Sequence, residues 1–166
     1  AGRMPGIVAC GSRNEAYKDF CTAIRLEPDA STLLVDSERP VTHTNPWNHL
    51  SEYDHWRKPD GADENTVFLM VQCMESWFLA DTDAIRRILG NELNESSLPG
   101  RPDIEENPKQ DVLNRLRSAS SQCRKQYDKG RHSFQILGEL NPQKVRERSS
   151  HCDRMLTILE EKQSNV

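Results

Sequence analysis

Residues 32–38 read TLLVDSE, and this segment decides the expected fold because an apolar run ends there on two carboxylates. Residues 33–35 form the short apolar run typical of a strand buried on both faces, and Pro40 stops the strand soon afterwards. Side chains alternate along a strand, so Asp36 and Glu38 would lean to the same side if the extended geometry continues. The segment therefore predicts a buried strand that delivers two acids to a sheet edge.

The residues before this segment have the pattern of a strand, a tight turn and a helix. Residues 6–10 (GIVAC) have the composition of a short strand, and apolar residues at helical spacing follow as far as Ile24. Ser12, with Glu15 three residues later, matches a helix capping box. Two strands joined by a crossover helix run parallel, so the opening of the chain predicts a βαβ unit and a parallel sheet.

The rest of the chain continues an α/β pattern. Residues 66–73 (TVFLMVQC) are the most apolar segment and predict a central strand, which runs into MESWFLAD and places Glu75 where a strand gives way to a helix. Open α/β sheets usually form their sites at such places. Residues 40–65 predict a long ordered loop, and helical turns or helices are predicted at 46–53, 81–89, 108–123, 133–140 and 151–162.

Length and composition limit the class of protein. A chain of 166 residues is expected to form one domain, 1–166, with a core of its own. No apolar run approaches the roughly 18 residues of a membrane-spanning helix, and the chain does not open with the pattern of a signal peptide. We therefore expect a cytoplasmic protein without membrane association. The five cysteines include no CxxC pair, which argues against a zinc site.

Charge is unevenly placed along the chain. Residues 1–83 contain 7 basic and 14 acidic side chains, whereas residues 109–148 contain 10 basic and 4 acidic side chains. This separation would allow one region to hold cations and another to hold a polyanion. Solvated helix faces account for the charge pattern equally well.

Asp36, Glu38 and Glu75 are the candidate metal ligands. They follow two predicted strands, and hard cations such as Mg²⁺ or Mn²⁺ prefer oxygen ligands. In the alternative interpretation, Asp36 caps a turn and Glu38 is solvated. Other chemistries have less support, because no serine lies in a GxSxG elbow and the five histidines form no HxxxH or HExxH pair.

Basic side chains could supply the matching contacts to a phosphate. Lys109 lies at a predicted helix start and could neutralise a phosphate. A second group surrounds Gly130 and could contact a nucleic-acid backbone, although each member could also be a surface charge. The predicted substrate-binding residues are Arg13, Lys129, Arg131 and His132.

Five segments, taken in order, resemble the bacterial family DUF4276: VACGSRNEAYKDFCTAI, LLVDSERPV, LMVQCMESWFLAD, NPKQDVLNRL and YDKGRHSFQILGELNP. The resemblance spans about residues 3–155, and VQCMESWFLAD is its most specific part. It implies a Toprim-like α/β domain with three layers and a mostly parallel sheet flanked by helices, similar to the nuclease half of overcoming-lysogenization-defect (OLD) proteins. Members often occur beside ATPases in defence-type gene clusters, which implies an ATPase partner.

The resemblance also implies roles for single residues. The Toprim pattern combines a glutamate after a first strand, a DxD after a later strand, and further acids or a lysine, which together bind metal for phosphodiester cleavage. Asp36 and Glu38 match the DxD with Glu in second place, Glu75 resembles a further acid, and Lys109 matches the lysine. The family's opening strand, with its VEG-like glutamate, has no counterpart in this sequence.

The expected function is therefore Mg²⁺- or Mn²⁺-dependent cleavage or nicking of nucleic acid, with DNA as the expected substrate. Two alternatives from other classes stay open. One is a non-catalytic subunit that docks on an ATPase, and the other is a metal-dependent phosphatase or phosphotransferase that acts on small molecules. A homo-oligomer is compatible with each of them.

Overall fold

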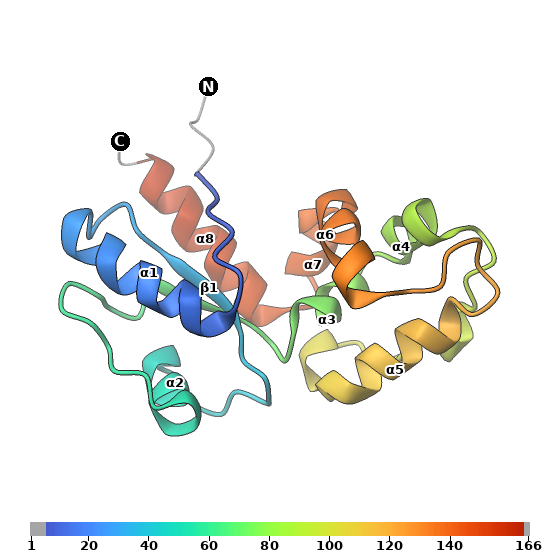
Figure 1. Ribbon diagram of the computed structural model, residues 1–166, viewed down its shortest axis with the longest axis horizontal. Coiled ribbons are helices and arrows are strands. Elements are labelled where there is room, and N and C mark those ends of the chain that lie inside the picture. Colours follow the sequence, from blue (N-terminus) through green and yellow to red (C-terminus); the bar gives the residue numbers. More distant parts are fainter. Residues whose placement is uncertain (1–5, 165–166) are drawn as a thin grey trace.

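The computed structural model describes residues 6–164. Figure 1 shows an elongated molecule with a small sheet and its helices at one end and a group of short helices at the other. The helix α8 (Ser150–Ser164) begins beside the helical end and runs along the sheet. Within residues 6–164 no helix is long and apolar enough to cross a lipid bilayer.

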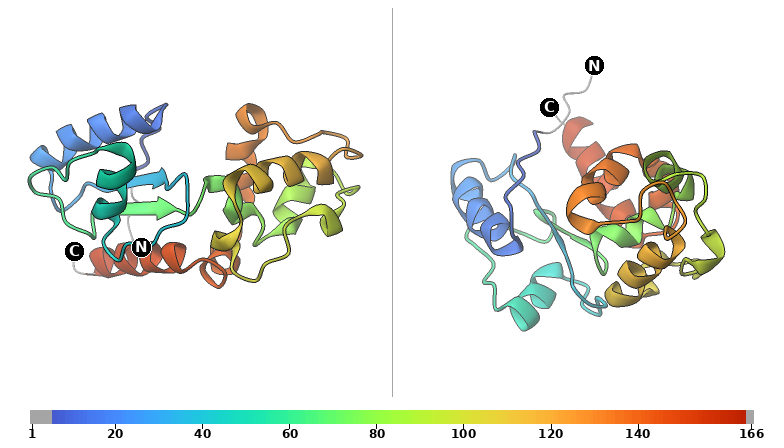
Figure 2. Two further views of the ribbon diagram at one scale, coloured as in Figure 1. Left: turned by 90° about the horizontal axis from the view of Figure 1, so that it is seen from below. Right: turned by 45° about the vertical axis from the view of Figure 1, so that its right-hand side comes forward.

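The sheet consists of two parallel strands, β1 (Leu33–Asp36) and β2 (Val67–Met70), whose last residues pair with each other. Helices α1 (Arg13–Leu26) and α2 (Pro46–Asp54) lie on one side of the strands and α8 lies on the other (Figure 2, left). Both arrows point toward the helical end. The predicted α/β class is confirmed, and the carboxyl edge of the sheet faces the group of helices.

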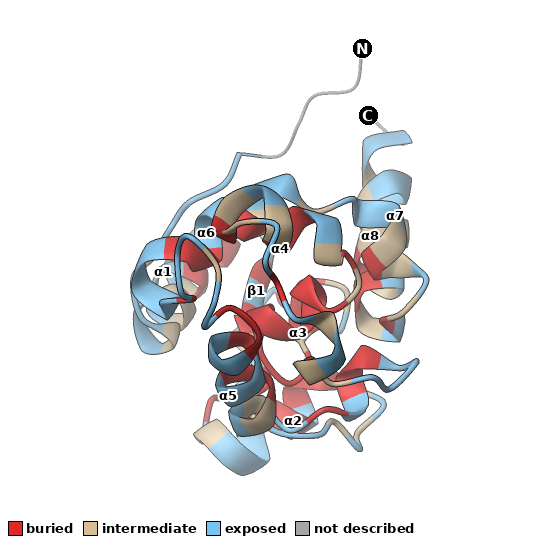
Figure 3. Ribbon diagram, turned by 90° about the vertical axis from the view of Figure 1, so that its right-hand side faces the viewer, coloured by how far each residue is buried: buried red, intermediate tan, exposed pale blue. Residues whose placement is uncertain are grey.

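The helical end is built from short elements around a buried centre. Figure 3 shows that α3 (Met74–Phe78) is buried throughout, and its residues anchor a large hydrophobic cluster. A second cluster fills the space between the sheet, α1 and α2. The other elements are α4 (Thr82–Leu89), the 3₁₀ turns η1 (Glu95–Ser97) and η2 (Ile104–Glu106), α5 (Lys109–Ala119), α6 (Lys129–Glu139) and α7 (Pro142–Arg146).

The predicted strand at residues 6–10 is wrong. These residues adopt no regular structure, and Ile7 and Val8 are 90% and 78% exposed. A strand needs a neighbour to satisfy its backbone N–H and C=O groups, and no other described segment pairs with residues 6–10. The expected βαβ opening is therefore reduced to a helix followed by a strand. The strand β1 is also not buried on both faces. Helix α8 packs on β2, and Leu34 of β1 stays 40% exposed.

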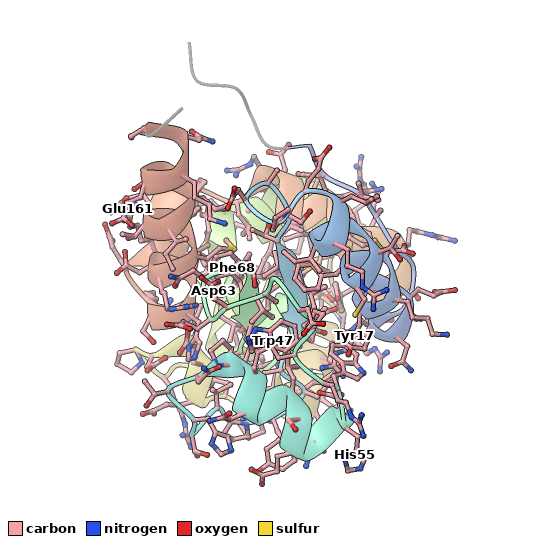
Figure 4. The ribbon with its side chains drawn as sticks, turned by 90° about the vertical axis from the view of Figure 1, so that its left-hand side faces the viewer. Tyr17, Trp47, His55, Asp63, Phe68 and Glu161 are labelled. Atoms are coloured by element: carbon pink, nitrogen blue, oxygen red, sulfur yellow. The ribbon has the colours of Figure 1, made fainter. Side chains whose placement is uncertain are left out.

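Several element boundaries differ from the predictions. The strand β2 ends at Met70, α2 is two turns long instead of one, and α6 begins at Lys129. Trp47 of α2 is buried and donates its indole N–H to the backbone oxygen of Asp63, in the loop after α2, at 2.7 Å (both labelled in Figure 4). The loop is thus fixed to the sheet through α2.

The predicted capping box of α1 is confirmed. Ser12 is the N-cap, its Oγ accepts the backbone N–H of Glu15, and the Glu15 carboxylate accepts the backbone N–H of Ser12. These two bonds satisfy donors that the helix itself leaves free.

Replacing Ser12 by alanine is expected to lower the free energy of unfolding by about 1 kcal/mol, because the N–H of Glu15 loses its acceptor. Urea denaturation followed by circular dichroism measures the change. Ser51→Ala, at an exposed position inside α2, is the matched control and should leave stability within about 0.5 kcal/mol. Equal effects of the two changes would contradict a role for the cap.

Candidate functional site

The candidate site lies where the carboxyl ends of the strands meet the start of α3, at the junction of the two ends of the molecule (Figure 1). Asp36 is the last residue of β1. After β2 ends at Met70, the chain runs through residues 71–73 into α3. The Oδ1 atom of Asp36 accepts the backbone N–H of Met74 at 2.8 Å. A carboxylate is favoured there because the first N–H groups of a helix have no partner within it. The structure thus brings the segments of Asp36 and Glu75 to one edge.

Lys109, the first residue of α5, bridges Asp36 at the end of β1 and Glu38 two residues later. Its Nζ atom lies 2.5 Å from Glu38 Oε2 and 3.8 Å from Asp36 Oδ2. The side chains of Asp36, Glu38 and Lys109 keep exposed fractions of 15%, 33% and 25%, so small ligands can reach them. Desolvation raises the pKa of Asp36, although the N–H of Met74 and the charge of Lys109 act in the opposite direction. The two carboxylates converge on one cation.

The backbone at Glu38 is left-handed, with a φ of 66°. The condition of continued extended geometry is therefore not met at Glu38, and strand alternation does not align the two acids. Instead, Glu38 donates its backbone N–H to Gln72 O at 2.9 Å, while Gln72 Oε1 lies 3.4 Å from the donating backbone N of Lys109. Non-glycine residues in this conformation cluster at functional sites.

Gln72 is a residue of the site that sequence reasoning missed. It holds both Glu38 and Lys109 through the bonds just described, and its side chain is buried. A polar amide near the end of the most apolar segment was the available signal, because a buried amide needs partners.

Glu75 is fully buried at the start of α3, with a relative exposure of 0%. Its Oε1 accepts the hydroxyl of Tyr127 at 3.0 Å and that of Ser133 at 3.2 Å. The Nζ of Lys129 lies 3.3 Å and 3.4 Å from the two carboxylate oxygens. The sequence predicted the position of Glu75, but it gave no signal for Tyr127 and Ser133, which come from a distant segment.

The pKa values around Glu75 describe an ion pair rather than a neutral acid. Burial alone would raise the pKa of Glu75, but Lys129 and the hydrogen bond from Tyr127 outweigh it and lower the pKa. Burial would likewise lower the pKa of Lys129, yet Glu75 and Asp36 raise it. Burial raises the pKa of Tyr127, which therefore stays protonated and keeps donating its hydrogen bond. Glu75 is ionised and engaged on both oxygens.

The predicted metal ligands fit a divalent cation in part. Asp36 and Glu38 offer oxygens to a shared point that the ammonium of Lys109 now approaches, and Mg²⁺ is often held by one or two carboxylates with water and substrate oxygens completing its shell. Glu75 directs its carboxylate to Tyr127, Ser133 and Lys129 instead. Among residues 6–164 no three or more Asp, Glu, His or Cys side chains gather into a metal site.

The predicted substrate-binding residues do not form one group. Arg13 makes a two-pronged ion pair with Asp54 at 2.6 and 3.0 Å and lies over the ring of Trp56, so it ties α1 to the end of α2. Lys129 contacts Glu75 in the site, whereas Arg131 and His132 line a separate surface groove. All three of these residues lie near the start of α6, but Lys129 contacts Glu75 while the other two face the groove.

Comparisons with known proteins agree with the resemblance seen in the sequence. The profile of the domain of unknown function DUF4276 matches residues 11–160, which covers both strands and all the residues of the candidate site. No curated protein and no solved structure gives a significant match. The chain therefore belongs to the DUF4276 family.

Proposed function

We propose that this protein is a metal-dependent phosphodiesterase that cleaves or nicks nucleic acid, with DNA as the substrate, and that Asp36 and Glu38 bind Mg²⁺ or Mn²⁺. The observation that carries the proposal is their convergence on the ammonium of Lys109 at the carboxyl edge of two parallel strands. Ligands in open α/β sheets bind at this edge. A Toprim-like site, as the sequence resemblance implies, would use the same residues.

The cation, when bound, would polarise a phosphoryl oxygen and lower the pKa of a water molecule. The chain itself also supplies positive charge. Lys109 carries three N–H donors at the start of α5, where the free backbone N–H groups of the helix also favour an anion. Glu75 positions Lys129 at the same edge, and both lysines can offset charge on a phosphate.

Glu75 remains a predicted metal ligand only if its carboxylate turns away from Tyr127 and Ser133. Its present contacts favour the role of a positioning residue for Lys129. An ATPase partner is part of the proposal and rests on the family resemblance. A homo-oligomer and a cytoplasmic location are compatible with it. The excess of basic residues at 109–148 favours a polyanionic substrate over a small molecule.

Two measurements test the proposal. Wild-type protein should nick supercoiled DNA in Mn²⁺ or Mg²⁺ and stop when a chelator is added. In titration calorimetry, Mn²⁺ should bind at least about tenfold more weakly to Asp36→Asn and to Glu38→Gln, because second-shell changes alone already cost about that much. Asp60→Asn, an exposed acid in a turn, is the control and should bind as the wild type does.

The outcomes separate the candidate functions. Metal-dependent release of phosphate from mononucleotides, without nicking of DNA, would replace the nuclease by a small-molecule phosphatase. Absence of both activities and of Mn²⁺ binding would overturn the proposal and favour a docking subunit.

A further inference from the structure

A groove of about 280 Å³ lies on the surface of the helical end, apart from the acids that follow β1. One wall comes from the connection before α6 and the other from α6 itself. Its lining contains no carboxylate and consists of Arg124, Lys125, Gln126, Arg131, His132 and Gln135. Every side chain in this groove can donate a hydrogen bond, and three of them are permanent cations at neutral pH.

His132 is the best-defined donor of the groove. It is only 4% exposed, and its Nδ1 accepts the backbone N–H of Asp128 at 3.1 Å. The proton of the neutral ring is therefore on Nε2, for which the described residues provide no hydrogen-bond partner. Because His132 lines the groove, this N–H is available to a ligand bound there.

The walls of the groove are held in place by the fold. The backbone N–H of Lys125 donates to Leu89 O at 3.0 Å, and that of Tyr127 donates to Ser120 Oγ at 2.8 Å. Asp128 caps α6 through the N–H of Arg131 at 3.0 Å. The backbone positions of the groove residues are therefore fixed before any ligand binds, which lowers the entropy lost on binding.

Helix electrostatics explain only part of this arrangement. Lys125 lies at the C-terminal end of α4, where a cation is favourable. Arg131 lies in the first turn of α6, where a cation is unfavourable because the helix N-terminus is itself positive. Asp128 offsets part of this positive charge, and a bound anion would offset more of it.

We propose that this groove binds a backbone phosphate of the nucleic-acid strand whose cleaved phosphodiester lies at Asp36, Glu38 and Lys109. This inference rests on the proposed function and adds a second contact point for its substrate. Lys129 lies two residues before Arg131 and contacts Glu75. The first turn of α6 therefore presents one cation to the groove and another to the acidic site. A strand that crosses this turn could contact the groove and the acidic site together.

Binding of a labelled single-stranded DNA oligonucleotide, followed by fluorescence anisotropy in the presence of a chelator, tests the groove. The double variant Arg124→Gln/Arg131→Gln should bind about tenfold more weakly and with a smaller salt dependence, because two phosphate contacts are lost. The control Arg25→Gln/Arg57→Gln removes the same charge from exposed positions at the sheet end and should weaken binding much less. Equal weakening in both double variants would overturn the proposal.

His132 provides a second readout in the wild-type protein. Its pKa is lowered by burial and by the charges of Lys125 and Arg131, with Asp128 opposing them. A phosphate in the groove should raise this pKa, as measured by NMR titration with the oligonucleotide. An unchanged pKa would overturn the proposal, and an equal response to inorganic phosphate or a mononucleotide would assign the groove to free phosphate instead of a strand.

The assay distinguishes failure of the groove from failure of the proposed function. The binding assay contains no free metal, so it can detect groove binding in a protein that does not nick DNA with Mg²⁺ or Mn²⁺. In that case the proposed activity alone is wrong. Conversely, unchanged nicking by Arg124→Gln/Arg131→Gln would support the proposed activity and contradict the proposed role of the groove. Thermal unfolding checks that both double variants are folded.

Discussion

Replacing Glu75 by alanine is expected to lower the free energy of unfolding by about 3–5 kcal/mol, which is a large part of the stability of a typical domain. The carboxylate is fully buried and holds Tyr127, Ser133 and Lys129, which come from a segment far along the chain. Its removal leaves a cavity and takes away the acceptor of two buried hydroxyl groups. Chemical denaturation measures the change.

Glu75→Gln measures the contribution of the negative charge of Glu75 separately from that of its side-chain volume. Glutamine fills the same volume and keeps one acceptor oxygen for Tyr127 and Ser133, but it loses the ion pair with Lys129, so the loss should be about 1–2 kcal/mol. Glu161→Gln, at an exposed position on α8 (Figure 4), is the control and should have almost no effect. A Glu75→Ala variant within 1 kcal/mol of the wild type would contradict this account.

The same residue should contribute to acid unfolding. The folded-state pKa of Glu75 is lower than its usual value of 4.5, so its contribution is complete above about pH 4.5 and is lost as the pH falls through the lower folded value. Asp36 has a raised pKa and acts with the opposite sign, since its stabilising effect decreases as the pH rises through the range above 3.8. Comparing Glu75→Gln with the wild type across this range isolates the first effect.

Asp36→Asn is expected to reduce metal-dependent nicking by at least about 100-fold, because a divalent ion contributes several kcal/mol of transition-state stabilisation. Asparagine keeps an oxygen that can accept the N–H of Met74, so α3 should remain capped and the variant folded. Rates on supercoiled DNA in Mn²⁺ measure the effect.

Lys109→Met separates catalysis from metal binding at the same edge. The substitution removes the ammonium group that contacts Asp36 and Glu38. Nicking should therefore fall about 100-fold, while Mn²⁺ should bind at least as tightly as to the wild type. Asp60→Asn again serves as the control. Weaker Mn²⁺ binding in Lys109→Met would contradict the arrangement in which Lys109 and the cation share two carboxylates.

The signals that worked in the sequence were local ones. Ser12 and Glu15 specify a capping box within one helical turn, and that cap is present. Apolar runs that end on polar residues located β1 and β2 and placed Asp36 and Glu75 at the same edge. These features depend on neighbours a few residues away, so their residue pattern is sufficient to predict them. The three-layer arrangement implied by the resemblance stays a prediction.

The predictions that failed depended on partners distant in the chain. Residues 6–10 have the composition of a strand, but no described segment pairs with them. Arg13 was assigned to substrate, yet the fold places it against Asp54, 41 residues away.

By itself, therefore, the sequence determined the elements and the acids at their ends. Only the tertiary structure decided which cation each carboxylate contacts: Lys109 for Asp36 and Glu38, and Lys129 for Glu75. The physical reason is that ion pairs and buried hydrogen bonds depend on distance in space, and spacing along the chain does not encode contacts between segments 50 or more residues apart.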